Sequence, residues 1–82
     1  MPRDKTSLFS LSEIDAELTR KILDEVYDSL KERGYNPTNQ IVGYLISGDP
    51  GYISSYKDAR KKIQQFDRSK ILSVLLESFQ GR

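Results

Sequence analysis

The sequence predicts an all-α fold, namely a compact bundle of about five helices with a flexible N-terminal arm, paired as a homodimer. Apolar residues recur at steps of three and four along most of the chain, as on the buried face of an amphipathic helix. No segment alternates apolar and polar residues between hairpin turns, so no strands are predicted. A chain of 82 residues forms one domain with a small core, and pairing of two copies commonly stabilises such a core.

The chain is predicted to divide into a flexible arm over residues 1–9 and a helical domain over residues 10–82. The arm is mostly polar, which is typical of loosely held termini. Ser10 and Glu13 have the spacing of a capping box, which predicts that the first helix begins there. Ser12 is the competing cap.

An amphipathic helix of about 20 residues is predicted to follow. Its apolar positions are Leu11, Ile14, Leu18, Ile22, Val26 and Leu30. Lys31 and Arg33 in the last turn suit the negative end of the helix dipole. Gly34 suits the left-handed conformation that ends many helices, so the helix is expected to stop there.

A second helix is predicted over residues 37–47. Asn36 is a strong N-cap candidate, and Pro37 fits the first helical position because its missing N–H would have no partner there. Apolar residues cover most of the circumference, which indicates burial on more than one side. Gly43 is expected to admit a neighbouring backbone, and Gly48 to end the helix.

Three shorter elements are predicted in the rest of the chain. Asp49 caps a short turn, Ser54 or Ser55 caps a fourth helix that ends near Phe66, and Asp67 caps a fifth. The apolar residues of the fifth helix are expected to face inward: Ile71, Leu72, Val74, Leu75, Leu76 and Phe79.

The composition argues against enzyme chemistry. Without His or Cys, disulfides, thiolate metal ligands and most zinc sites are excluded, so neither a metal nor a cofactor is predicted. The chain lacks a Gly-rich phosphate loop, and Asp49, the one acid in the central block, is interpreted as a helix cap. Without an apolar run near 18 residues or a signal peptide, a cytoplasmic protein without a membrane partner is expected.

Basic residues concentrate in residues 55–70, which hold six Lys or Arg against two Asp. A solvated helix face is one interpretation, and a docking patch for an acidic or phosphorylated partner is the other. The candidate docking residues are Lys57, Arg60, Lys61 and Arg68. Nucleic-acid binding is an alternative, but the net charge of only +1 and the uncharged second helix argue against it.

The central block carries more amides and tyrosines than simple connectors need. The candidate residues for a dimer or core scaffold are Tyr35, Asn36, Asn39, Gln40, Tyr44, Asp49 and Tyr52. Capping of the backbone and half-buried tyrosines that tie loops to the core would explain many of them. Asn39 and Gln40 fit caps less well, so a hydrogen bond across an interface is the second interpretation.

The stretch from Gly34 to Ile53, GYNPTNQIVGYLISGDPGYI, continues into Asp58-Ala59-Arg60. It resembles the IreB/ReoM family of small cytoplasmic regulators of Gram-positive bacteria, and the resemblance extends over nearly the whole chain. The resemblance implies an all-helical homodimer without catalytic activity. It also implies an N-terminal threonine that a membrane Ser/Thr kinase with PASTA domains phosphorylates, and a cognate phosphatase.

The resemblance implies that the kinase phosphorylates the threonine in a Thr-x-x-Phe-like context, which Thr6 and Phe9 provide here. The added charge of about −1.5 to −2 could move the arm relative to residues 55–70. Ser7 and Ser10 stay open as further acceptors. The implied output is control of peptidoglycan synthesis through turnover, by the Clp protease system, of the enolpyruvyl transferase at the committed step. The alternatives are a helical nucleic-acid-binding module or a structural subunit of a larger complex.

Overall fold

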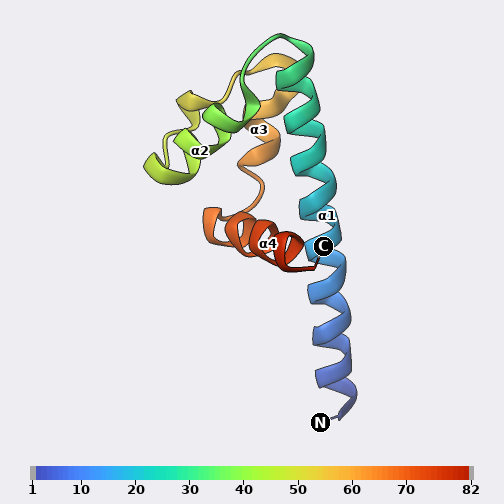
Figure 1. The fold of residues 1–82 in the computed structure, drawn as a ribbon. Coiled ribbons are helices and arrows are strands. Elements are labelled where there is room, and N and C mark those ends of the chain that lie inside the picture. Colours follow the sequence, from blue (N-terminus) through green and yellow to red (C-terminus); the bar gives the residue numbers. More distant parts are fainter. Residues whose placement is uncertain (1, 82) are drawn as a thin grey trace.

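The computed structural model describes the backbone of residues 2–81 and the side chains of residues 15–81. Within that range all regular structure is helical, which confirms the all-α prediction (Figure 1). The elements are α1 (Pro2–Glu32), α2 (Pro37–Ser47), the 3₁₀ helices η1 (Pro50–Tyr52) and η2 (Tyr56–Asp58), α3 (Ala59–Ile63) and α4 (Arg68–Gln80).

Helix α1 is the axis of the fold. Helices α2 and α3 lie beside its C-terminal half, α4 crosses nearer its middle, and its N-terminal end extends beyond the bundle (Figure 1). The core cluster consists of Leu23, Val26, Leu30, Tyr44, Ile53, Ala59, Ile63, Ile71 and Val74. Burying a large apolar side chain of this kind contributes roughly 1.5–3 kcal/mol, so these few residues supply much of the driving force for folding.

The first helix differs from its prediction in two ways. It begins at Pro2 rather than at the capping box of Ser10, so the backbone of residues 2–9 continues α1. Leu18, predicted to be in the core, is 48% exposed, whereas Thr19 is fully buried. Burial of Thr19 is tolerated because its hydroxyl donates to the carbonyl of Asp15 at 2.7 Å.

The boundaries of α2 are those that the sequence predicts. The side chain of Asn36 accepts a hydrogen bond from the backbone N–H of Asn39 at 3.0 Å, and Pro37 occupies the first turn. Gly48 ends the helix with φ +78°, a conformation that glycine adopts without strain. Gly34, with φ +91°, plays the same part after α1.

The predicted burial of α2 on several sides is wrong for the single chain. Tyr44 is buried, but Val42 is 44% and Ile46 79% exposed. Gly43 does admit a close neighbour, although not a backbone: a Cβ at this position would lie 2.5 Å from Cδ1 of Tyr52. The ring of Tyr52 therefore packs on the one residue of α2 that has no side chain.

The predicted fourth helix is interrupted and ends early. Lys57 (φ +51°) and Asp58 (φ +62°) take left-handed conformations, which separate η2 from α3, and α3 stops at Ile63 rather than near Phe66. The side chain of Ser55 makes no capping hydrogen bond. Such a pair of residues costs roughly 1–3 kcal/mol each, so surrounding contacts must hold them.

Helix α4 begins after Asp67 as predicted, although that side chain makes no capping hydrogen bond. The prediction that its apolar residues all face inward is wrong. Only Ile71 and Val74 are buried. The exposed ones are Leu72, Leu75, Leu76 and Phe79. One side of α4 is therefore anchored in the core, and the other presents an apolar surface.

Candidate functional site

The predicted phosphoacceptor Thr6 lies in the first turns of α1, where the structure gives the backbone but not the side chain. With a rise of about 1.5 Å per residue, Thr6 lies roughly 40 Å along α1 from Glu32 and about 14 Å from Asp15. Lys57 pairs with Glu32 at the far end of α1, and Lys70 pairs with Asp15. Along α1, the backbone of Thr6 is therefore closer to the level of Lys70 than to that of Lys57.

Three lysines of residues 55–70 are paired with acids of α1. Nζ of Lys57 lies 2.8 Å from Oε1 of Glu32, Nζ of Lys62 lies 3.3 Å from Oε1 of Glu25, and the pair formed by Lys70 measures 2.8 Å. The hydrogen bond and the charge of Lys57 lower the pKa of Glu32, and the same contacts raise the pKa of Lys57. These partly exposed pairs link η2, α3 and α4 to α1, and each contributes only modestly to stability because water screens it.

The arginines of the candidate docking set also make contacts within the chain. Nε of Arg60 donates to the carbonyl of Ile53 at 2.8 Å. Arg68 donates to the carbonyl of Leu45 at 3.0 Å, and its guanidinium lies against Gly48. Lys61 is exposed and forms no ion pair among the residues whose side chains are described. Of the four, Lys61 presents its charge most freely to a partner.

The polar residues of the central block act largely within the chain. Oε1 of Gln40 accepts a hydrogen bond from the backbone N–H of Ser54 at 2.9 Å, which ties α2 to the segment before η2. Asp49 caps η1 as predicted, by accepting from the N–H of Gly51 at 2.8 Å. The side chain of Asn39 is exposed. Gln40 thus holds α2 to the segment before η2, whereas the side-chain amide of Asn39 is exposed on the surface.

The tyrosines divide into two kinds. Tyr44 is 6% exposed and belongs to the core, whereas Tyr35 and Tyr52 are exposed.

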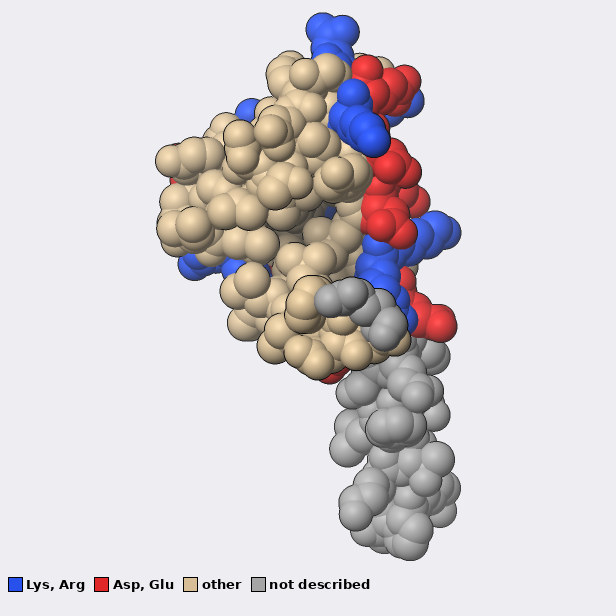
Figure 2. Space-filling model, viewed as in Figure 1, with Lys and Arg blue, Asp and Glu red and all other residues tan. Residues whose placement is uncertain are grey.

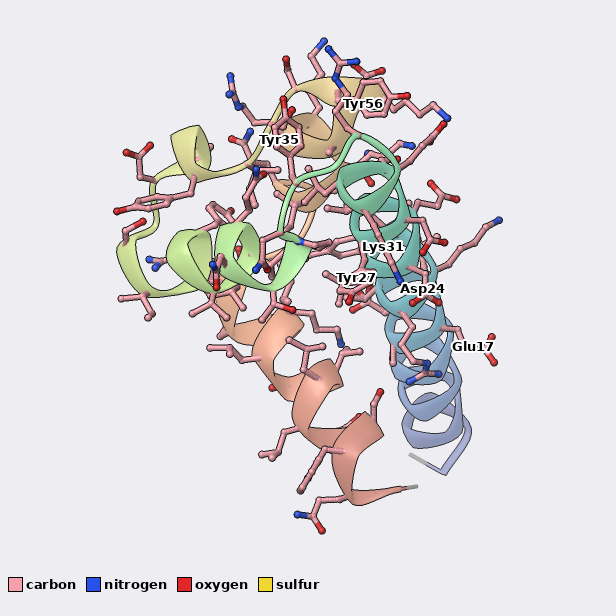
Figure 3. All side chains as sticks on the ribbon, turned by 45° about the horizontal axis from the view of Figure 1, so that its top comes forward. Glu17, Asp24, Tyr27, Lys31, Tyr35 and Tyr56 are labelled. Carbon is pink, nitrogen blue, oxygen red and sulfur yellow. The ribbon has the colours of Figure 1, made fainter. Side chains whose placement is uncertain are left out.

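Tyr56 makes cation–π contacts with two basic residues. The guanidinium of Arg33 lies 5.4 Å from the centre of the Tyr56 ring, and Nζ of Lys57 lies 5.7 Å from it, within the range of cation–π attraction. Both contacts lie near the C-terminal end of α1 (Figure 3), and the second, together with the ion pair to Glu32, helps to hold the strained Lys57.

An apolar groove of about 200 Å³ lies between α1, α2 and α4. Its lining residues are Tyr27, Thr38, Ile41, Val42, Leu45 and Leu75. Sequence reasoning missed this groove because it assigned the apolar residues of both α2 and α4 to the interior. The signal was present, since each helix has more apolar positions than one buried stripe needs.

Exposed apolar side chains continue from the groove over α2 and α4. We define the α2–α4 face as Tyr27, Val42, Leu45, Ile46, Leu72, Leu75 and Leu76. Figure 2 shows an uncharged surface over α2 and the near side of α4, while Lys, Arg, Asp and Glu gather along α1 at its edge. A continuous apolar surface of this kind is typical of an interaction site rather than of free monomer surface.

Among the described residues, no group of three or more His, Cys, Asp or Glu could hold a metal ion. No described helix is long and apolar enough to cross a bilayer.

Comparison with known families identifies a match over most of the chain. A family model described as the IreB regulatory phosphoprotein matches residues 4–80. The match includes Thr6, the capped central block and α4, so it extends over the helical bundle and the predicted phosphorylation segment. The chain therefore belongs to the IreB family of regulatory phosphoproteins.

Proposed function

We propose that this chain is a non-catalytic adaptor whose activity is switched by phosphorylation of Thr6. The observation that carries the proposal is the family match over residues 4–80, because a regulatory phosphoprotein needs an acceptor and Thr6 lies within the matched segment. Phe9 follows Thr6 at the spacing that the resemblance associates with the acceptor.

The position of Thr6 suits a switch that acts on partners. The N-terminal end of α1 extends beyond the other helices (Figure 1), so a kinase can reach its backbone without opening the core. Phosphorylation replaces a neutral hydroxyl with about −1.5 to −2 charges, enough to create or remove a binding surface for a partner protein. The bundle then serves as a scaffold that the modification leaves intact.

The partners in this proposal are those that the family resemblance implies. A Ser/Thr kinase with PASTA domains adds the phosphate in the cytoplasm, and a cognate phosphatase removes it. The unphosphorylated homodimer promotes turnover of the enolpyruvyl transferase of peptidoglycan synthesis by the Clp protease system, and phosphorylation relieves that effect. Lys61 and its neighbours on α3 are the candidate docking residues, because Lys61 is exposed and outside the ion pairs of α1.

Phosphopeptide mapping by mass spectrometry, after incubation with the kinase domain of a PASTA-type kinase and ATP, tests the acceptor. We expect one phosphate on Thr6 in the wild type and in Ser7→Ala and Ser10→Ala, and none in Thr6→Ala. Phosphate confined to Ser7 or Ser10, or absent from all three, would show that Thr6 is not the switch.

A pull-down from cell extract tests the adaptor role. Thr6→Ala should retain the transferase and Clp components, and in-vitro phosphorylated wild type should lose them. Thr6→Glu should have an intermediate effect, because a carboxylate carries one charge rather than nearly two. Equal recovery by phosphorylated and unphosphorylated protein would contradict a phosphorylation-controlled adaptor.

A further inference from the structure

Two consecutive residues at the junction between η2 and α3 have left-handed backbone conformations. Lys57 has a φ of +51° and Asp58 a φ of +62°, and in the described part of the chain they are the only residues other than glycine with a positive φ. A left-handed conformation brings Cβ close to the following carbonyl oxygen, so other contacts must offset its cost. The side chain of Asp58 makes no capping hydrogen bond to α3, whereas that of Lys57 reaches Glu32 on α1.

The sequence at this junction favours a continuous helix instead. Tyr56, Ala59 and Ile63 are spaced by three and four residues, as on one face of a helix. Ser54 and Ser55 are residue types that begin helices as N-caps. Local preference and tertiary structure therefore disagree at the junction, and in folded proteins such disagreements are expected at functional or strained sites. We call the observed backbone the interrupted form and the alternative the continuous form.

One exposed side chain, that of Lys57, helps to hold the interrupted form. Its Nζ lies 2.8 Å from Oε1 of Glu32 and 5.7 Å from the centre of the Tyr56 ring. The side chains of Lys57 and Glu32 are each 53% exposed, so water and salt weaken their attraction. An exposed pair of this kind does not outweigh the cost of two left-handed residues.

The backbone hydrogen bonds of the junction do not favour either form. The N–H of Asp58 donates to the carbonyl of Ser55 at 3.0 Å, and the N–H of Arg60 donates to the carbonyl of Ser54 at 3.1 Å. In a continuous helix that begins at Ser54, each of these N–H groups would donate to the carbonyl four residues before it, so the bonds are replaced rather than lost. Little net free energy therefore separates the two forms.

The continuous form places different charges together. Lys57 and Lys61 are four residues apart, which puts them side by side on one face of a helix. In the interrupted form Lys57 instead pairs with Glu32, while Lys61 is exposed and forms no ion pair among the described side chains. Like charges at this spacing repel, so the chain alone favours the interrupted form. An acidic segment that contacts both lysines removes the repulsion and favours the continuous form.

We propose that an acidic segment of a partner protein converts the η2–α3 junction to the continuous form and docks on Lys57 and Lys61. Without the partner, the ion pair with Glu32 keeps Lys57 away from Lys61. The inference rests on the docking role of Lys61 in the proposed function and adds the rearrangement that completes the docking surface. A ligand shifts a conformational equilibrium only by its preference for one form, so affinity for the acidic segment must change with the conformation of the junction.

Two substitutions of Asp58 test this coupling at equal net charge. Asp58→Gly favours the interrupted form, because glycine adopts a left-handed conformation without strain and weakens helices. Asp58→Ala favours the continuous form, because alanine has the highest helix propensity. Isothermal titration calorimetry with a short synthetic oligoglutamate should show at least about fivefold tighter binding by Asp58→Ala, since affinity scales with the populated fraction of the competent form. Equal affinities of the two variants would overturn the proposal.

NMR of the wild-type chain tests the rearrangement itself, even if an Asp58 variant fails to fold. The Cα chemical shifts of residues 57 and 58 should move to helical values as oligoglutamate saturates the protein. Glu32→Gln, which releases Lys57, should raise the affinity at least about twofold. Glu17→Gln is the matched control, because it makes the same charge change elsewhere on α1 (Figure 3), and it should leave the affinity nearly unchanged. Equal effects of both Gln variants, or bound oligoglutamate with residues 57 and 58 still left-handed, would contradict the rearrangement.

Lys61→Ala separates this inference from the docking role on which it rests. If Lys61→Ala weakens binding of oligoglutamate while the two Asp58 variants bind equally, Lys61 remains a docking residue and the rearrangement is rejected. If neither the wild type nor Asp58→Ala binds oligoglutamate, docking through these lysines is rejected together with the rearrangement. Phosphorylation of Thr6 is mapped by mass spectrometry without oligoglutamate, so neither result decides the phosphorylation switch.

Discussion

The two flanks of α1 are covered in different ways. On one flank, η2 and α3 lie against the helix, and lysines pair with Glu25 and Glu32. On the other flank, Tyr27 borders an apolar groove, and Asp24 and Lys31 form no ion pair with the other described side chains. We call the side of α1 beside η2 and α3 the closed flank, because its charged side chains are paired within the chain. We call the side beside Tyr27 the open flank, because it leaves apolar and charged side chains available to a second molecule.

Truncation of a core residue on the closed flank should have the largest effect. Ile63 of α3 is fully buried, so Ile63→Ala should lower the free energy of unfolding by about 2–5 kcal/mol. Leu76 on the open flank is 62% exposed, so Leu76→Ala should change the stability of a single chain by less than about 0.5 kcal/mol.

Urea unfolding at several protein concentrations measures both variants. The loss in Ile63→Ala should not depend on concentration, whereas any loss in Leu76→Ala should appear only where dimers form, because dimer stability depends on protomer concentration. Equal, concentration-independent losses would mean that the two flanks do not differ.

Removal of the Gln40 acceptor should have the next largest effect. Gln40→Ala leaves the partly buried N–H of Ser54 without its partner, at a cost of about 1–2 kcal/mol. Gln40→Glu keeps an acceptor oxygen and should recover most of that loss, which thermal unfolding can measure. If Gln40→Ala instead weakened the dimer without changing the stability of the monomer, Gln40 would be an interface residue after all.

The cap of α2 gives a prediction of about 1 kcal/mol. Asn36→Ala removes the side-chain oxygen that accepts from the N–H of Asn39 and should destabilise the chain by that amount. Asn39→Ala removes an exposed amide from the same turn and should be nearly neutral in stability. Chemical denaturation of both variants decides whether this turn is held by its cap, and a larger loss in Asn39→Ala would contradict that assignment.

The exposed pair of Glu32 and Lys57 should have the smallest effect. The lowered pKa of Glu32 means that its contribution to stability is present above its ordinary pKa of 4.5 and is lost as pH falls through the folded-state value. The raised pKa of Lys57 means that its contribution is present below 10.5 and is lost as pH rises through its folded-state value.

Stability measured across pH in the wild type and Glu32→Gln tests this pair. The variant should be slightly less stable near neutral pH, and the difference should vanish in acid. A difference that grows as pH falls would have the wrong sign for an ion pair.

Residue types and their near neighbours in the sequence predicted the boundaries of α2 correctly. Asn36 and Pro37 start α2, and Gly48 ends it, because caps and positive φ angles depend on residue type and near neighbours. The left-handed pair at Lys57 and Asp58 was not predictable in this way, because lysine has no preference for that conformation. The ion pair of Lys57 with Glu32, which is 25 residues away in the sequence, exists only in the folded chain and helps to hold this conformation.

The candidate site was less predictable than the fold, for two physical reasons. Helical periodicity shows that Leu72 and Leu76 are apolar and share a side of α4, but not whether the same chain or another molecule covers them. The partner of Gln40 is the N–H of Ser54, fourteen residues away, and only the tertiary fold brings the two together. Family resemblance supplied Thr6, which composition alone would not single out.

Hydrogen exchange followed by mass spectrometry, over a range of protein concentrations, tests the difference between the flanks most directly. We expect amide protection in residues 56–63 to be independent of concentration, because contacts within the chain cover them, and any rise with concentration to be confined to α2 and α4, whose apolar side chains are exposed. Protection that rises in residues 56–63 but not in α2 or α4 would contradict the account.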